Sequence, residues 1–95
     1  MTNPVFSTFL TLTLTTMYYT YIIYSRSVDK FYVGQSANVE LRLEFHNSGE
    51  SRYTSKANDW ELVHVEEYLT RTEAIKRENE IKRKKSRKYI EHLLS

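Results

Sequence analysis

The chain has 95 residues, of which 40% are hydrophobic and 27% are charged. A chain of this length folds as one small domain, and the lack of cysteine excludes disulfides and thiolate metal sites and fits a cytoplasmic location. The formal net charge is +2, but nine Lys or Arg and four acids lie from Arg71 onward, against five and eight before it. The composition therefore predicts a basic C-terminal element.

Residues 1–16 differ from the rest of the chain because they contain no charged side chain. They lack the positive start of a secretory signal, and threonine interrupts their apolar run too often for a membrane span. We expect a poorly ordered extension here, with an edge strand formed by "FLTLTLT" or a weak targeting signal as the alternatives. The folded domain is expected over residues 17–95, without membrane association.

From Tyr18 onward the chain shows alternating strand and helix patterns. Aromatic and β-branched residues predict strands over residues 18–25, 30–34 and 60–68. Ser36 is a suitable N-cap for a helix over residues 37–46, which ends near Asn47 and Gly49. A polar loop over residues 50–59 separates this helix from the third strand.

Two further helices are predicted after the third strand. Thr70 and Glu73 have the spacing of a capping box and open a long basic helix. Ser86 begins a short last helix, in which Ile90, Leu93 and Leu94 are expected to pack inward. The order strand, strand, helix, strand, helix, helix indicates a single α+β domain.

The inward face of the first helix combines apolar and functional side chains. A face with helical spacing contains Val39, Arg42, Leu43 and His46. In the alternative, Arg42 and His46 are solvated at the edge of a core made by Leu41, Leu43 and Phe45.

Glu78 interrupts the apolar stripe of the second helix, between Ile75 and Ile81. A carboxylate in such a position is usually paired or bound to a metal. The alternatives are a salt bridge to Arg42 and a flank position that is exposed to water.

These positions together resemble the GIY-YIG nuclease superfamily, with "TYIIYS" at the first motif and "FYVGQS" at the second. The matching positions are Tyr21, Tyr32, Gly34, Arg42, His46 and Glu78. The resemblance covers roughly residues 18–93 and is to the free-standing, single-domain branch, which is similar to the nuclease domain of excision-repair endonucleases. It implies a small three-stranded antiparallel sheet flanked by helices, in the order β-β-α-β-α-α.

The chain departs from the family pattern at three points. Tyr19 and Thr20 replace the glycine and isoleucine of the first motif, and the late asparagine of several members has no clear counterpart after Glu78.

The resemblance implies hydrolysis of nucleic-acid phosphodiesters with a divalent metal. Glu78 would hold Mg²⁺ or Mn²⁺, because one carboxylate with waters suits these hard cations. Arg42 would contact the non-bridging phosphate oxygens through its guanidinium.

The remaining matched residues would handle the attacking water. Arg42 and the metal would favour the phenolate of Tyr21, which would take the water's proton. Tyr32 would orient the water or the phosphate. His46 would hydrogen-bond within this network or assist proton transfer. Gly34 would keep the backbone close to the site, where a side chain would block the substrate.

The basic helices predict a nucleic-acid surface that contacts the backbone without reading sequence. Its expected members are Lys76, Arg77, Lys82, Arg83, Lys84, Lys85, Arg87 and Lys88. A solvated basic face is the alternative. In the loop, Arg52, Tyr53 and Lys56 would add stacking and phosphate contacts, whereas Trp60 is expected in the core.

We therefore expect a metal-dependent endonuclease that acts on branched, nicked or non-specific DNA, in repair or recombination. The alternatives are a non-catalytic nucleic-acid-binding module of the same fold and a structural domain whose basic helix binds a protein. The oligomeric state is not predicted.

Overall fold

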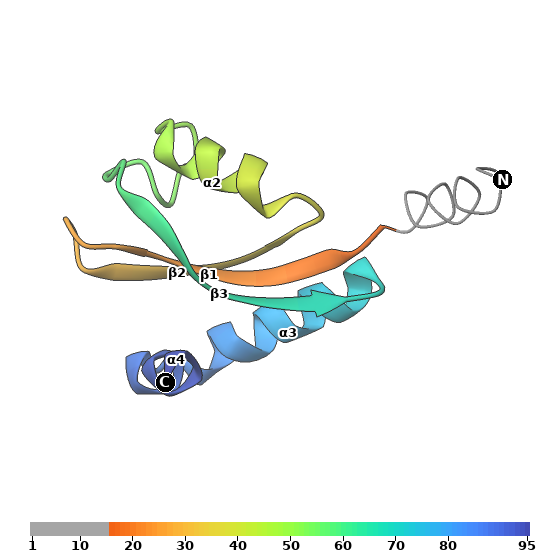
Figure 1. Cartoon of the computed structure of the whole chain (residues 1–95). Coiled ribbons are helices and arrows are strands. Elements are labelled where there is room, and N and C mark those ends of the chain that lie inside the picture. Colours follow the sequence, from red (N-terminus) through yellow and green to blue (C-terminus); the bar gives the residue numbers. More distant parts are fainter. Residues whose placement is uncertain (1–15) are drawn as a thin grey trace, which may run out of the picture.

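The computed structural model describes residues 16–95, so the extension predicted over residues 1–16 lies outside the described residues except for its last one. The elements follow the predicted order (Figure 1): β1 (Tyr18–Ser25), β2 (Lys30–Ser36), α2 (Val39–Asn47), β3 (Trp60–Tyr68), α3 (Arg71–Lys84) and α4 (Arg87–Leu94). None of the helices in this part of the chain is long and apolar enough to cross a membrane.

Strand β1 is the centre of the sheet. The strand order is β2-β1-β3 and both pairings are antiparallel, which confirms the predicted three-stranded sheet and the α+β class. Thr20, Tyr21, Ile22 and Ile23 are each exposed by 1% or less. Because β1 is covered on both faces, consecutive residues of this strand are buried, and its sequence lacks the alternation of apolar and polar residues that marks a half-buried strand.

The two faces of β1 contact different helices, since successive side chains of a strand point to opposite sides. Tyr21 and Ile23 pack with Trp60 on the face toward α2. Ile22 packs with Ile81 of α3, and residues of α4 pack against this second cluster. Helix α2 therefore covers one face of the sheet, and α3 and α4 cover the other (Figure 1).

The termini of α3 and α4 confirm the predicted caps. Thr70 and Glu73 form a reciprocal capping box at the start of α3. The side chain of Ser86 accepts a hydrogen bond from the Tyr89 backbone N–H at the start of α4. Between the two helices, Lys85 has a left-handed conformation with φ 48°.

The first helix begins later than predicted. Strand β2 stays paired with β1 as far as Ser36, opposite Tyr19, so Ser36 belongs to the strand. The N-cap is Asn38, whose side-chain oxygen accepts a hydrogen bond of 3.0 Å from the Leu41 N–H. The predicted helix start at residue 37 and strand end at residue 34 are therefore wrong by two residues each.

Helix α2 packs through the face predicted from its spacing. Val39 and Leu43 contact the core cluster, and His46 is completely buried. Leu41, which belongs to the alternative core, is 60% exposed, so that alternative is wrong. Leu94, expected to pack inward in α4, is 36% exposed.

A polar cluster joins β3 to the two C-terminal helices. Arg77 donates to both carboxylate oxygens of Glu66, to Glu80 and to the hydroxyl of Tyr89. Although burial alone would raise the pKa of Glu66, hydrogen bonds from Arg77, His64 and Tyr68 lower it to about 2. Arg77 therefore links structural elements, although its position in the basic helix led to its prediction as a nucleic-acid contact.

Candidate active site

The site begins where Tyr21 of β1 lies beside Gly34 of β2. Tyr21 lies opposite Gly34 in the antiparallel register, and its phenol extends across the glycine backbone. A Cβ at Gly34 would lie 2.5 Å from the Tyr21 hydroxyl oxygen and 2.7 Å from the ring carbon that bears it. Gly34 is required because it leaves room for the phenol of Tyr21.

The Tyr21 hydroxyl is the first member of a buried hydrogen-bond chain. It lies 2.9 Å from Nε2 of His46, and Nδ1 of His46 lies 3.0 Å from Oγ1 of Thr54. All three side chains are exposed by 1% or less. Each buried polar atom of this chain therefore has a partner, as a dry site requires. No pattern in the irregular loop at residues 50–59 could have identified Thr54.

Burial keeps His46 neutral. Desolvation, followed by the positive charge of Arg42, lowers the pKa of His46 from 6.5 to about 4. A neutral imidazole has one N–H and one free lone pair. If Thr54 accepts from Nδ1–H, then Nε2 of His46 accepts the phenolic proton of Tyr21, and the opposite tautomer reverses both bonds.

Tyr32 supplies the second phenol of the site. Its ring lies 4.8 Å from the imidazole of His46, measured between centroids. Nζ of Lys82 lies 5.8 Å from the centroid of the same ring. Tyr32 is only partly buried, so it lies between the buried chain and the surface.

Arg42 lies on α2, with its guanidinium 4.6 Å from the ring centroid of Phe45. Burial raises the pKa of Tyr21 above its ordinary value of 10, and Arg42 opposes this rise without cancelling it. The Tyr21 phenol is therefore protonated at neutral pH, and Arg42 alone does not produce the phenolate that the sequence predicts for Arg42 together with a metal. Arg42 also acts on His46, so its charge reaches both members of the buried pair.

Glu78 reaches the site from α3. Its negative charge contributes to the raised pKa of Tyr21. Its carboxylate accepts a bond of 2.6 Å from Nζ of Lys82, so its partner is Lys82 and the proposed alternative of a salt bridge to Arg42 is wrong. The Glu78 side chain is 15% exposed.

The carboxylate of Glu78 is the available metal ligand at this site. No group of three or more His, Cys, Asp or Glu residues within residues 16–95 could hold a metal ion. Mg²⁺ commonly binds through one or two carboxylates while waters and substrate phosphates complete its shell. The single carboxylate of Glu78 therefore fits Mg²⁺ or Mn²⁺, provided that Lys82 releases it.

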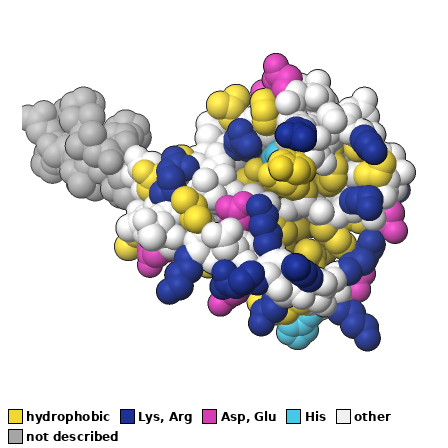
Figure 2. All heavy atoms as spheres, turned by 180° about the vertical axis from the view of Figure 1, so that it is seen from behind, with side chains coloured by type: hydrophobic (Ala, Val, Ile, Leu, Met, Phe, Trp, Pro, Cys, Tyr) yellow, Lys and Arg dark blue, Asp and Glu magenta, His cyan; other side chains and the backbone are white. Residues whose placement is uncertain are grey.

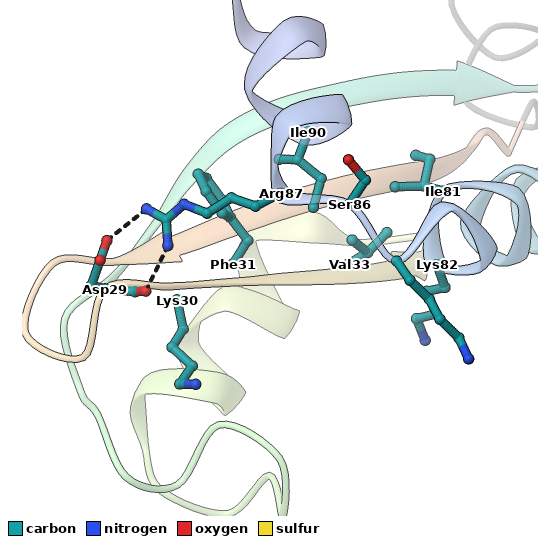
Figure 3. Close-up of a pocket in the computed structure, with 10 residues that line it drawn as sticks. Asp29, Lys30, Phe31, Val33, Ile81, Lys82, Ser86, Arg87 and Ile90 are labelled. Carbon is teal, nitrogen blue, oxygen red and sulfur yellow. Dashed lines mark hydrogen bonds and ion pairs between the residues drawn. The ribbon is translucent and has the colours of Figure 1, made fainter.

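Cations surround the edge of β2 next to the site. A pocket of about 260 Å³ between β2 and the α3–α4 junction is lined by Lys30, Lys82, Lys85 and Arg87. Figure 3 shows Lys30 and Lys82 extending to the same side, toward α2. Arg87 is bound to Asp29 and to Glu91, so it is less free to bind a ligand.

The other predicted cations lie on exposed positions of α3 and α4. They are Lys76, Arg83, Lys84 and Lys88. Figure 2 shows Lys and Arg side chains around a hydrophobic patch on the face opposite to the view of Figure 1. Lys30, at the start of β2, is a cation of this region that the helix-based prediction omitted.

We predict that Gly34→Ala displaces the phenol of Tyr21. The added methyl group has no space beneath the ring, so the free energy of unfolding should fall by about 1–3 kcal/mol. The bond between Tyr21 and His46 should also break. Urea unfolding and the NMR shifts of His46 measure these effects. Gly49→Ala is the control for the His46 shifts, because no atom lies within 4 Å of its added Cβ. Its own stability should also fall, since the φ of +86° at Gly49 strains an alanine, but its His46 shifts should be unchanged. An unchanged stability and unchanged His46 shifts in Gly34→Ala would contradict the packing described.

We also predict a pH-dependent stability that His46 controls. The unfolded chain protonates His46 near its ordinary pKa of 6.5, whereas the folded chain does so only near 4. The unfolded state therefore binds more protons between these values, and stability should fall by about 3 kcal/mol as the pH decreases across this window. Urea unfolding at several pH values from 7 to 4 measures the loss. A His46→Gln variant should show a smaller loss, and an equal loss in both proteins would contradict the assignment.

Comparisons with known proteins identify the family. The model of the GIY-YIG catalytic domain matches residues 17–90. A UPF0213 protein of Haloquadratum walsbyi is 41% identical over 66 residues, which cover 68% of this chain and 73% of the relative. UPF0213 proteins of Natronomonas pharaonis and Staphylococcus haemolyticus are 38% and 36% identical, over the same share of this chain and over 76% and 79% of theirs. No solved structure matches the chain. The chain therefore belongs to the GIY-YIG family and consists largely of its catalytic domain.

Proposed function

We propose that this protein is a divalent-metal-dependent endonuclease that hydrolyses DNA phosphodiester bonds. The observation that carries the proposal is the hydrogen bond between Tyr21 and His46, buried above Gly34 and within reach of the charges of Arg42 and Glu78. A phenol, an imidazole, a guanidinium and a carboxylate in one place supply a proton acceptor, phosphate binding and a metal ligand.

Tyr21 acts as a proton relay in this proposal. Its phenol is protonated at neutral pH, because burial raises its pKa. It can accept a proton from the attacking water only if it passes its own proton on. Nε2 of His46 would receive that proton, because it is neutral and lies 2.9 Å from the hydroxyl. Tyr32 lies against His46 at the exposed side of the pair, where it would orient the water or the phosphate.

Arg42 binds the phosphate on which the reaction takes place. Its guanidinium can donate two parallel hydrogen bonds to non-bridging oxygens, which carry the negative charge of the transition state. A bound phosphate would also reduce the influence of Arg42 on His46. The proton affinity of His46 would then rise when substrate is present, which favours the relay.

Glu78 would hold the metal, which supplies positive charge to the phosphate and lowers the pKa of a bound water. Lys82 forms an ion pair with this carboxylate in the structure and must move away for a metal to bind. Lys82 is 46% exposed and lies near the face of Tyr32, so its flexible side chain can turn toward an incoming phosphate. Binding of DNA and binding of metal would then assist each other.

The basic surface would bind DNA through its phosphates. Lys82 contacts Glu78 and the ring of Tyr32, and Lys30 and Lys85 line the same pocket as Lys82. Affinity from such contacts decreases steeply as salt increases. Contacts of this kind do not read sequence. We propose branched, nicked or non-specific DNA as the substrate and a cytoplasmic role in repair or recombination.

The bond between Glu78 and Lys82 also favours a second candidate, a DNA-binding module of the same fold that does not cut. A stable ion pair would leave no free ligand for a metal. One experiment separates the two candidates.

We predict that Glu78→Gln abolishes cleavage but preserves folding and DNA binding. The amide keeps the shape of the carboxylate and removes the charge that a metal requires, so cleavage should fall at least about 100-fold. Labelled linear, nicked and branched DNAs are incubated with the protein, with and without Mg²⁺ or Mn²⁺. Binding is measured in the absence of metal.

Glu80→Gln is the matched control. Glu80 is on the same helix and is also bound to a basic side chain, but its partner is Arg77, which belongs to the cluster with Glu66 of β3. This variant should cut like the wild type. Wild-type cleavage by Glu78→Gln would contradict the role of Glu78, and a wild-type protein that binds DNA without cutting any substrate would favour the second candidate.

A further inference from the structure

A second pocket lies beside the site, between β2 and the loop that precedes β3. Its volume is about 370 Å³, within the range of about 300–1000 Å³ that is usual for ligand pockets. Its lining includes four aromatic residues and three cations, which are Phe31, Tyr32, Tyr53, Trp60, Lys30, Arg52 and Lys56. The lining contains no carboxylate. A ligand with flat apolar faces and negative charge suits this combination.

The loop holds these side chains on a fixed base. Ser51, Thr54 and Ala57 are buried, with backbone hydrogen bonds from Thr54 to Ser51 and from Ala57 to Thr54. Nε1 of Trp60 donates to the carbonyl oxygen of Thr54 at 3.1 Å. The loop is thus attached to the core at several points.

Tyr53 lies on this anchored loop but is 79% exposed. Arg52 and Lys56 are also exposed, so these three side chains do not contribute to the core of the domain. Within residues 16–95, the side chains of Lys30, Arg52 and Lys56 form no ion pair. These charges remain available to a ligand.

The pocket is continuous with the proposed active site. Tyr32 lines the pocket, and its ring lies 4.8 Å from that of His46. Thr54 also lines the pocket, and its hydroxyl is bonded to Nδ1 of His46. A group bound in the pocket would therefore be next to a phosphate bound at Arg42.

We propose that this pocket binds an unpaired nucleobase of the substrate strand, adjacent to the phosphate that is cut. This inference rests on the proposed function. The base would stack on Tyr53, while Lys30, Arg52 and Lys56 contact the flanking phosphates, as in other sites for single strands. A base in a duplex is paired and stacked, and would first have to leave the helix. The pocket thus selects single-stranded segments over intact duplex.

The chain offers a direct probe of the pocket, because Trp60 is its sole tryptophan. A short oligothymidylate, added without divalent metal, should quench the fluorescence of Trp60. Tyr53→Ala should weaken this binding by about tenfold, in the range observed for stacking residues. Tyr53→Phe should restore it, because the ring is retained. An oligomer without bases should bind the wild type about as weakly as oligothymidylate binds Tyr53→Ala.

Leu41→Ala is the control, since Leu41 is an exposed apolar residue of α2 that does not line the pocket. It should bind like the wild type. Oligouridylate, tested in parallel, distinguishes RNA from DNA as the source of the base. Equal affinity of the wild type and Tyr53→Ala, or equal affinity for oligomers with and without bases, would overturn the proposal.

The same variants separate this inference from the proposed function. Cleavage of single-stranded and duplex DNA at equal rates, unaffected by Tyr53→Ala, would overturn the base pocket and leave the nuclease intact. Base-dependent quenching without any cleavage would overturn the nuclease and support the pocket as a binding site.

Discussion

The contact between the phenol of Tyr21 and the backbone of Gly34 determines the rest of the site. The antiparallel register of β1 and β2 sets these residues opposite each other, and the missing side chain lets the ring lie flat on the strand. The hydroxyl then reaches His46 on α2, and His46 reaches Thr54 in the loop. One small residue in an edge strand thereby connects the sheet, a helix and a loop around a single polar chain.

Core and site share the same residues in this small domain. Tyr21 packs with Ile23 and Trp60 on one face of β1, and its hydroxyl belongs to the site. The buried environment that stabilises the ring also keeps the phenol protonated and the imidazole of His46 neutral. Around this neutral centre, Arg42, Lys82 and Glu78 provide charge at the more exposed rim. In the proposed chemistry, the negatively charged phosphate binds to the charged groups at the rim, while the buried pair stays neutral until a proton is transferred.

Much of this arrangement could be predicted from the sequence. The strand patterns, the capping box at Thr70 and the spacing of Val39, Leu43 and His46 follow local rules, and the structure confirms them.

The start of α2 is predicted two residues too early, because Ser36 and Asn38 are both good N-caps and only the pairing of β2 with β1 decides between them. The role of Thr54 depends on a tertiary contact, which a pattern in one segment cannot contain. The bond between Glu78 and Lys82 is an i,i+4 pair on α3, so the helical spacing could have indicated it. The spacing of charges groups Arg77 with the other cations, although Glu66 on β3 binds it.

The central claim is that the Tyr21 hydroxyl takes part in hydrolysis. Tyr21→Phe tests it most directly, because the ring still fills the space over Gly34 and only the proton-carrying oxygen is lost. The variant should fold, with a free energy of unfolding reduced by about 1–3 kcal/mol because His46 loses a buried partner. Its Mg²⁺-dependent cleavage of labelled DNA should fall by about 100-fold or more, while DNA binding is retained. A folded Tyr21→Phe protein that cleaves DNA at the wild-type rate would contradict the account.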